Sequence, residues 1–363
     1  MRTVIPVALA TVVASFITAC GHDTPTEVDD RTAQFAKGGG GSEEGYVIEV
    51  LVAGGGQDAD INRSGTIVGR AGDGGFAWRA GVVEPIAPPN GASSARLQGM
   101  NDDELIAGYA IYPVSEGVAR QSATLWTPGA QGFTALDLGA QLNAGSEANG
   151  VDAASAVTGK HGNNIDNPWR AFVWLPTGEV RDLEPLPGAV NGSIGNSIDD
   201  LGYVAGVSSG HDGNNSDHAV IWLPGGTTPV DLGPGNTRDI VTDAAGARVY
   251  VVGWTFQTVR NKTVQTATRW TVNAGDGGIV ETRLLGPGVA LGVNPSGDVV
   301  GTADSKAVLW TAGGETVRLS CLAKAASCGA TAINGDGVIV GWSGGSHVTG
   351  GGTVRWVPVG GSN

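Results

Sequence analysis

Recognisable catalytic motifs are scarce in this sequence. It has no Cys-x-x-Cys pair, no phosphate-binding glycine loop and no His-Glu-x-x-His zinc motif. These absences exclude the redox, nucleotide-binding and metalloprotease classes that such motifs mark. The sequence therefore assigns no catalytic residue, metal ligand or cofactor, and we expect a protein without a cofactor.

Positive charge is also in short supply, because 21 Lys and Arg stand against 35 Asp and Glu and give a net charge of -14. Such a surface repels phosphate backbones, which argues against nucleic acid as a partner. Charged residues make up only 15% of the chain, whereas Gly and Pro number 61 and 17. This composition favours short strands joined by tight turns over long helices.

The first nineteen residues have the pattern of a secretory signal peptide. A single charge at Arg2 precedes an apolar run from Val4 to Ile17, and Ile17-Thr18-Ala19-Cys20 resembles a bacterial lipobox. We expect cleavage before Cys20 and acylation of this residue, which would attach the protein to a membrane. The alternative is an ordinary signal peptide followed by an accidental cysteine.

Residues 20–45 read as an acylated cysteine followed by a flexible tether. The stretch is polar and acidic, contains four consecutive glycines and cannot bury enough apolar surface to fold. Because Gly21 rather than Asp follows Cys20, a diderm cell would place the protein in its outer rather than its inner membrane. The predicted domains are thus 1–19, 20–45 and a folded domain over 46–363.

A tryptophan recurs through the folded domain. The first five members of the series are separated by a constant step of 48 residues, and two more follow after steps of 40 and 46. A step of this size indicates stacked supersecondary units, with each Trp buried between neighbours. The series is Trp78, Trp126, Trp174, Trp222, Trp270, Trp310 and Trp356.

Each unit reads as four short antiparallel strands, the blade of a β-propeller. It opens on Asn or Asp, usually with Gly three residues on, which is the chemistry of a tight hairpin. Glu104 and Ser155 replace this Gly in two units. The seventh unit lacks a fourth strand, and the spare strand Tyr46–Leu51 could supply it. We therefore predict an all-β, seven-bladed propeller closed by its N-terminal strand.

The repeated unit resembles the HAF-type extracellular repeat. The similarity is clearest in Ala332–Gly341, Ala171–Trp174 and Val230–Gly233, and it extends over roughly Tyr46 to Pro358. Only one unit, at His218-Ala219, has the histidine of that repeat. The resemblance implies an exported, propeller-like protein and carries over no catalytic residue.

The longest connections join second to third strands and are predicted to gather on one face of the ring, where binding sites commonly lie. Calcium is one alternative for the loop containing Asp212, Asn214 and Asp217, but the spacing misses a calcium-binding loop, and a solvated turn is preferred. Trp254 and Trp342 share one position in their units, which favours packing over ligand contact. The candidate ligand residues on this face are Trp169, His161, Asp166, His211, Asp212, Asp217, Tyr112, Trp254 and Trp342.

Two functions remain open from the sequence. The first is a monomeric envelope scaffold that binds glycan or protein ligands on its loop-rich face. The second is a glycoside hydrolase or polysaccharide lyase. Carboxylates with a His or Arg converging on the central channel would favour the enzyme, whereas small apolar side chains there would favour the scaffold. Cys321 and Cys328 are expected to form a disulfide in an oxidising compartment.

Overall fold

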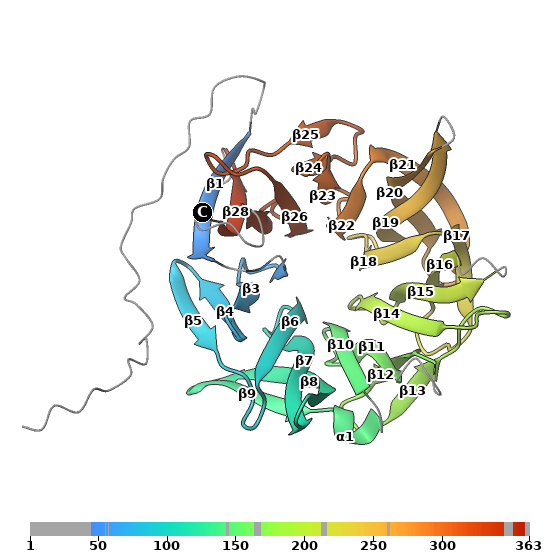
Figure 1. Ribbon diagram of the computed structural model, residues 1–363. Coiled ribbons are helices and arrows are strands. Elements are labelled where there is room, and N and C mark those ends of the chain that lie inside the picture. The colour runs from blue at the N-terminus through green and yellow to red at the C-terminus, as the bar shows by residue number, and fades with distance from the viewer. Residues whose placement is uncertain are drawn as a thin grey trace, which may run out of the picture. The chain divides into compact units, whose positions relative to one another are not determined.

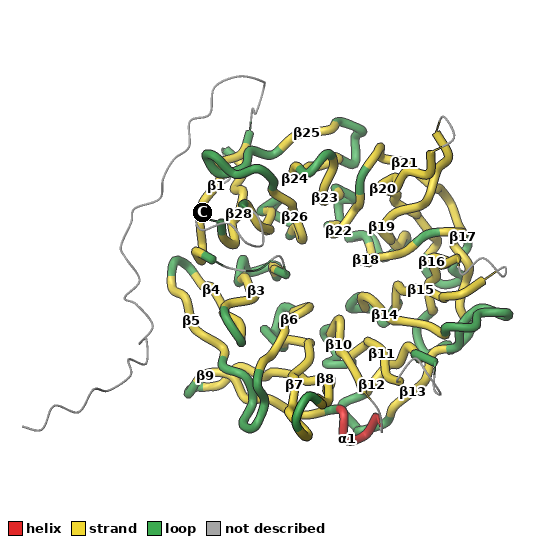
Figure 2. The backbone as a smooth tube through the Cα atoms, in the orientation of Figure 1, coloured by secondary structure: helices red, strands yellow, loops and turns green. Residues whose placement is uncertain are grey.

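The protein folds as a ring of seven antiparallel sheets around a central axis (Figure 1). The computed structural model describes residues 45–359, except for positions 55, 57, 143–144, 163–167, 212–215, 260–261 and 345–350. All described residues belong to the compact unit Gln34–Asn363. Strands and turns make up nearly all of the backbone in Figure 2, and the short α1 (Gly139–Leu142) is the only helix in the described ranges.

Every blade has four strands, and its first strand lies nearest the axis. This confirms the seven-bladed propeller predicted from the tryptophan repeat. Blades 1 to 3 comprise β2 (Ala59–Ile61), β3 (Ile67–Ala71), β4 (Gly74–Arg79) and β5 (Val82–Ile86); β6 (Ser94–Met100), β7 (Ile106–Ser115), β8 (Val118–Gly129) and β9 (Gly132–Asp137); and β10 (Gly145–Val151), β11 (Val157–Gly162), β12 (Arg170–Trp174) and β13 (Val180–Leu183).

The remaining blades repeat this arrangement, with the longest hairpin in blade 5. Blades 4 to 6 comprise β14 (Gly192–Ile198), β15 (Val204–His211), β16 (Ser216–Trp222) and β17 (Pro229–Pro234); β18 (Asn236–Thr242), β19 (Arg248–Val259), β20 (Lys262–Asn273) and β21 (Ile279–Pro287); and β22 (Val289–Val293), β23 (Val299–Ala303), β24 (Lys306–Trp310) and β25 (Thr316–Arg318). Blade 7 comprises β26 (Cys328–Ile333), β27 (Ile339–Ser343), β28 (Gly352–Pro358) and β1 (Tyr46–Ala53).

The ring is closed by the N-terminal strand, as predicted. Strand β1 pairs antiparallel with β28, from Tyr46 opposite Pro358 to Ala53 opposite Gly352. Ile48 is buried in the core of blade 7, and Glu49 forms an ion pair with Arg355 at 2.7 Å. The outer edge of β28 is therefore covered by a strand from the other end of the chain, which leaves the ring without a gap.

The turns between first and second strands follow the Asn/Asp and Gly pattern. Asn62 illustrates the geometry: its Oδ1 accepts the backbone N–H of Thr66 at 2.9 Å, and Gly65 has a φ of 83°. Glu104 and Ser155 occupy the glycine position with φ values of 61° and 65°. Both adopt the left-handed conformation that glycine accepts more readily, so the turn geometry is kept despite its steric cost.

The seven periodic tryptophans are buried and pack against the preceding blade. Trp222 of blade 4, for example, lies in a cluster with Ala171 and Leu183 of blade 3. Burial of such large side chains contributes much of the interface between blades. The predicted disulfide joins Cys321 to Cys328, with their Cα atoms 5.6 Å apart, in the segment that enters blade 7.

Candidate functional site

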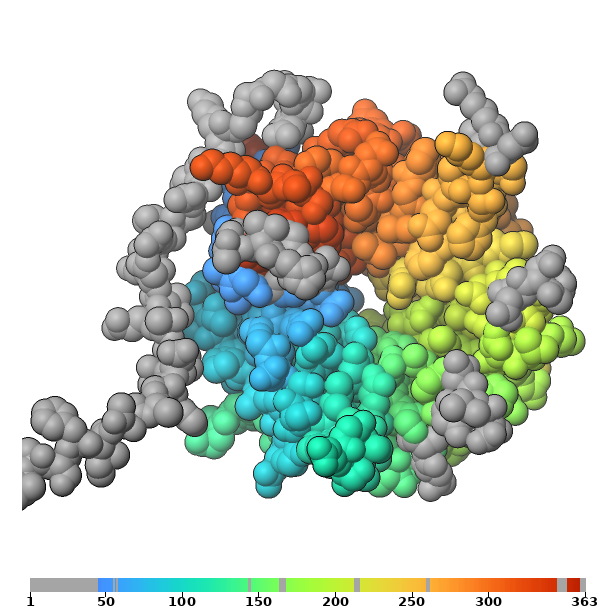
Figure 3. All heavy atoms as spheres, viewed as in Figure 1, coloured from blue at the N-terminus to red at the C-terminus, as the bar shows by residue number. Residues whose placement is uncertain are grey.

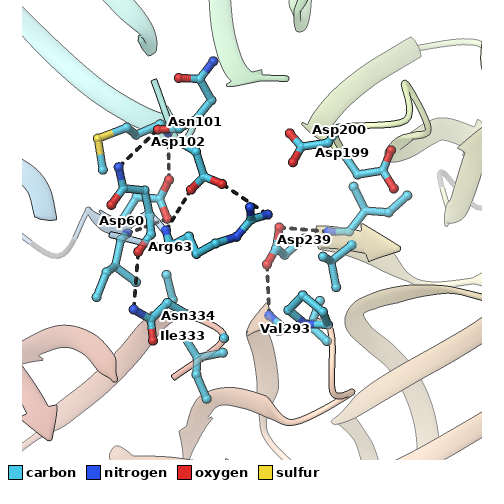
Figure 4. Close-up of a pocket in the computed structure, with 18 of the residues that line it drawn as sticks. Asp60, Arg63, Asn101, Asp102, Asp199, Asp200, Asp239, Val293, Ile333 and Asn334 are labelled. Carbon is cyan, nitrogen blue, oxygen red and sulfur yellow. Dashed lines mark hydrogen bonds and ion pairs between the residues drawn. The ribbon is translucent and has the colours of Figure 1, made fainter. Parts of the chain in front are cut away.

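A polar pocket lies on the propeller axis, where the inner strands of all seven blades end. Figure 3 shows the opening at the centre of the ring, and Figure 4 shows the pocket in close-up. The pocket has a volume of about 260 Å³ and is lined by residues of the inner strands and of the turns that follow them. Because second strands run back from these turns, the long loops between second and third strands open at the opposite end of the ring.

Two first-strand positions place half-buried carboxyl groups in the pocket. The second strand of every blade contains a glycine, which is Gly69 in blade 1. The residue directly before this glycine pairs with one residue of the first strand, and the comparison below concerns that first-strand residue. Five blades have a small residue here, whereas Asp60 in blade 1 and Asp239 in blade 5 are carboxylates. The five small residues are Gly99, Gly150, Ser197, Gly292 and Ala332.

Asp60 connects blade 1 to blade 2. Its Oδ1 accepts the N–H of Ile61 and its Oδ2 accepts the N–H of Met100 from β6, both at 2.8 Å. Asp239 repeats this arrangement between blades 5 and 6. It accepts the N–H of Ile240 at 2.8 Å and that of Val293 from β22 at 2.9 Å. Each carboxylate therefore holds two adjacent inner strands together.

Burial makes ionisation of these carboxyl groups costly. The pKa of Asp60 is raised to about 7, mainly because the group is withdrawn from water, and the negative charge of Asp239 adds to the shift. The two backbone N–H donors act in the opposite direction, since they favour the carboxylate. Burial likewise raises the pKa of Asp239, despite hydrogen bonds from Val293, Ile240 and Ser197.

Three more aspartates and one arginine complete the charged lining. Asp102 accepts the N–H of Arg63 at 2.8 Å and forms an ion pair with its guanidinium at 3.2 Å. Asp200 accepts the N–H of Ala153 at 3.0 Å, and Asp199 caps its own turn. The Arg63 side chain points into the middle of the pocket, as Figure 4 shows. Five carboxyl groups thus surround one guanidinium.

The residues predicted for the loop-rich face are spread over several blades and contact other side chains. In blade 3, His161 Nε2 lies 2.8 Å from Asp182 Oδ1, and the Lys160 ammonium lies 4.5 Å from the centre of the Trp169 ring. In blade 2, the guanidinium of Arg120 lies 4.9 Å from the ring centre of Tyr112.

Blade 4 brings two histidines together near this face. His211 is buried, its Nε2 lies 3.0 Å from Ser208 Oγ, and its ring centre is 4.7 Å from that of His218. Asp217 is half-buried on β16 and pairs with Ser209 of β15. Of the residues predicted for the loop-rich face, His211 and Asp217 therefore lie together in blade 4. The other described ones belong to blades 2, 3, 5 and 7.

Trp254 and Trp342 are half-buried, and Trp254 lies beside an inner strand. The guanidinium of Arg238, on β18, is 5.1 Å from the centre of the Trp254 ring. Trp342 pairs with Gly329 of β26, where an added Cβ would lie 2.7 Å from its Nε1. Each of these tryptophans thus contacts the first strand of its own blade. Cys20, Asp166 and Asp212 lie outside the described residues.

Two Gly-x-Ser-x-Gly strings occur, centred on Ser208 and Ser343, but neither forms a nucleophile elbow. Both serines lie within strands, are buried and accept a backbone N–H at 2.9 Å, from Leu186 and Leu322 respectively. An elbow instead exposes its serine at a sharp strand-to-helix turn. These serines therefore connect loops to strands and lack the exposed setting of a nucleophile elbow, although Ser208 Oγ lies 3.0 Å from His211 Nε2.

Two absences hold for the described ranges alone. No three His, Cys, Asp or Glu side chains in these ranges are grouped so that they could hold a metal ion. No helix there is long and apolar enough to span a bilayer.

The sequence signal for the axial pocket is a carboxylate at a first-strand position where the other blades have a small residue. In blade 1, Asp60 stands two residues before the turn residue Asn62, where other units have Gly, Ala or Ser. In blade 5 the hairpin is longer, so Asp239 stands four residues before Asp243. The equivalence of Asp60 and Asp239 is therefore visible only once the strand register is known.

Comparisons with known proteins agree on the fold. No family profile matches the sequence, and no curated protein is recognisably related to it. Streptogramin B lyase superposes with a TM-score of 0.53 at 11% identity, over 87% of this chain and 98% of that one. U3-55K gives 0.51 at 12% identity, over 86% and 98%.

A gluconolactonase from Xanthomonas campestris gives a lower TM-score of 0.43 at 10% identity, over 86% of this chain and 90% of that one. At 11% and 12% identity, the superpositions with streptogramin B lyase and U3-55K concern the fold alone. They do not transfer an activity, because one fold supports many functions.

Proposed function

We propose that the protein is a binding propeller whose axial pocket receives a cationic group, such as the side-chain amine of a lysine in a peptide ligand. The observation that supports this most directly is the convergence of five aspartates on a pocket with one arginine. A pocket whose charged lining is mostly acidic concentrates cationic ligands. Its volume of about 260 Å³ suits a single side chain.

Arg63 is the residue that such a ligand would displace. Its side chain is 77% exposed and is connected to the wall by the ion pair with Asp102. Exposed ion pairs contribute little to stability, so the guanidinium can leave at small cost. Asp60 and Asp239, in contrast, are fixed between inner strands by backbone N–H donors. The pocket thus combines two carboxyl groups held by backbone N–H donors with one arginine side chain that a ligand can displace.

The test is a titration of the full chain with N-acetyl-lysine methylamide, followed by calorimetry. We expect binding that weakens at high salt, because exposed charges are screened. Asp200→Asn should weaken it about fivefold and Arg63→Gln should tighten it by a similar factor, on the scale of one exposed charge pair. Asp73→Asn, at an exposed turn between β3 and β4, is the control variant.

A neutral probe of similar size distinguishes recognition of the charge from nonspecific apolar binding. N-acetyl-norleucine methylamide lacks only the amine, and it should bind at least tenfold more weakly than the lysine probe. Equal affinity for the two probes, or an Asp200→Asn variant that binds the lysine probe as well as the unaltered chain, would refute the proposal.

A second candidate function, glycan hydrolysis or elimination, draws support from the elevated pKa of Asp60. Carboxyl groups whose environments differ are what acid–base catalysis on sugars requires. However, both oxygens of Asp60 already accept backbone N–H groups. The test is an assay of the chain on a panel of polysaccharides. If the unaltered chain and Asp73→Asn cleave a polysaccharide and Asp60→Asn does not, glycan cleavage replaces cation binding as the proposed function.

The predicted envelope location belongs to the same proposal. The lipobox around Cys20 supports a lipid-anchored protein, with glycan or protein ligands on the loop-rich face as a further prediction. Radiolabelled palmitate should enter the full chain and not the Cys20→Ala variant, because acylation needs this thiol. Label retained by Cys20→Ala would overturn the anchor.

A further inference from the structure

Six of the seven first strands contain a β-bulge, which is one residue without a partner in the second strand. A bulge re-aims the side chain that it carries. In blades 3, 4 and 7 this side chain donates to a backbone carbonyl in the first strand of the next blade. The pairs are Asn149 Nδ2 with the Gly195 carbonyl at 2.8 Å, Asn196 Nδ2 with the Thr237 carbonyl at 2.7 Å and Thr331 Oγ1 with the Ala59 carbonyl at 2.6 Å.

Arg238 is the bulge residue of blade 5, and its side chain has no hydrogen bond or ion pair with the residues that the structure describes. It is exposed, whereas Thr237 is buried and Asp239 is half-buried. Arg238 lies within β18, the strand of its blade that is nearest the axis (Figure 1). An exposed side chain at this position faces the central channel, whose opening Figure 3 shows.

Arg238 lies on the loop-rich side of Asp239. From Arg238, β18 runs through Asp239 to the turn at the axial pocket, and Arg238 is not among the residues that line this pocket. Its guanidinium lies over the ring of Trp254, 5.1 Å from the ring centre. Contact with a ring face uses none of the five N–H donors of a guanidinium, so these donors remain available to an acceptor in the channel.

Charged side chains of blades 1 to 3 gather around Tyr109, which pairs with Arg96 of β6. The pKa of Tyr109 is raised mainly by burial, and the negative charges of Glu147 and Asp58 add to the shift. The positive charges of Arg96 and Arg70 act in the opposite direction. Two carboxylates and two guanidinium groups therefore lie near this tyrosine.

The same region of the channel contains Arg238. Tyr109 and Trp254 hold equivalent positions, directly after the glycine of their second strands. Burial lowers the pKa of Arg238, and the negative charge of Asp58 opposes this shift. Asp58 thus acts on both Arg238 and Tyr109, so blades 1, 2, 3 and 5 direct charges to one region.

This region has more positive than negative charge, in contrast to the axial pocket. Glu147 is neutralised by the ammonium of Lys160, 3.1 Å away. Among the groups named above, one carboxylate, Asp58, then remains against three arginines, none of which has an ion pair with a described residue. The excess of two positive charges matches a ligand with two negative ones.

We propose that the loop-rich half of the channel binds a small dicarboxylate. Arg238 donates two parallel N–H groups to one carboxylate, the arrangement that guanidinium geometry favours. Arg96 holds the other from blade 2, across the ring from blade 5 (Figure 1), and its guanidinium has a single hydrogen bond within the described residues, to the Ala95 carbonyl at 2.8 Å. Neither arginine lines the axial pocket, so failure of the cation-binding function would leave this site unaffected.

The experiment is a calorimetric titration of the full chain with succinate, in a buffer of low ionic strength without other carboxylates. We expect saturable binding with a dissociation constant on the order of millimolar, as suits a ligand of so few atoms. Succinamide has the same shape without the charges, and it should bind at least tenfold more weakly. Equal affinity for succinate and succinamide would refute the site.

Substitution of the arginines tests their separate roles. Arg238→Gln should weaken succinate binding at least tenfold, and Arg238→Lys, which keeps the charge but loses the paired donors, should have an intermediate effect. Arg96→Gln should weaken it at least threefold. Because the Arg238 side chain forms no hydrogen bond with a described residue, Arg238→Gln should keep the urea unfolding midpoint of the unaltered chain.

Arg248→Gln is the matched control. Arg248 is exposed in the same blade, where β19 leaves the turn at the axial pocket, so its replacement removes one positive charge far from the proposed ligand. This variant should bind succinate like the unaltered chain. Unchanged affinity in Arg238→Gln or in Arg96→Gln, or an equal loss in Arg248→Gln, would overturn the proposal.

Discussion

Removal of β1 is expected to abolish cooperative folding of the propeller. Without Tyr46–Ala53, β28 would present an open edge, Trp356 would lose its cover by Ile48, and Arg355 would lose Glu49. Arg355 also lies 4.3 Å from the ring centre of Trp78, so the loss extends into blade 1. A whole strand with its core contacts contributes several kcal/mol, on the order of the total stability of a domain.

The measurement is urea unfolding followed by circular dichroism, combined with size-exclusion chromatography. A chain that starts at Gly54 should lack a sigmoidal transition and should form aggregates through its open edge. A chain that starts at Gly45 keeps β1 and is the control. A peptide with the sequence of Tyr46–Ala53, added in trans, should restore the transition, whereas a scrambled peptide should not. An unchanged midpoint after deletion would contradict the role of β1.

The propeller is expected to gain stability as the pH falls from 8 to 5, because of Asp60. Its pKa is about 7 in the folded protein, whereas an unfolded aspartate has a pKa of about 3.9. Between these values the folded state binds more protons than the unfolded state, so the free energy of unfolding increases as the pH falls. Over this range the gain is about 2.5 kcal/mol. Burial of Asp239 acts in the same direction.

Comparison with Asp60→Asn isolates the effect. Asn cannot titrate, so the stability difference between the unaltered chain and this variant should grow in favour of the unaltered chain as the pH falls. Denaturant unfolding at several pH values measures the difference, and Asp73→Asn should show none of this trend. The carboxyl groups with lowered pKa, Glu104 and Asp137, lose their contribution only below the window tested. A difference that is constant with pH would rule out the proposed ionisation.

The fold could be predicted because its signals are local and repeated. The tryptophan step set the number of blades, and the Asn/Asp and Gly turns located the first hairpin of each blade. Closure by β1 followed from a missing strand at one end and a spare strand at the other. The disulfide between Cys321 and Cys328 could be predicted from their separation of 7 residues together with the export that the first nineteen residues predict.

The axial pocket was hidden from the sequence because it depends on strand register. The extended hairpin of blade 5 moves Asp239 away from its expected distance to the turn. Its lining residues come from different blades, so only the folded ring brings them together.

The direction of β1 also determines the face of the ring on which the folded domain begins and ends. Tyr46 begins this strand beside Gly337, in a turn between first and second strands, and the N–H of Val359 donates to the carbonyl of Gly45 at 2.6 Å. Both ends of the folded ring therefore leave it on the face that contains the axial pocket. The loop-rich face, at the opposite end of the ring, carries neither of these two ends.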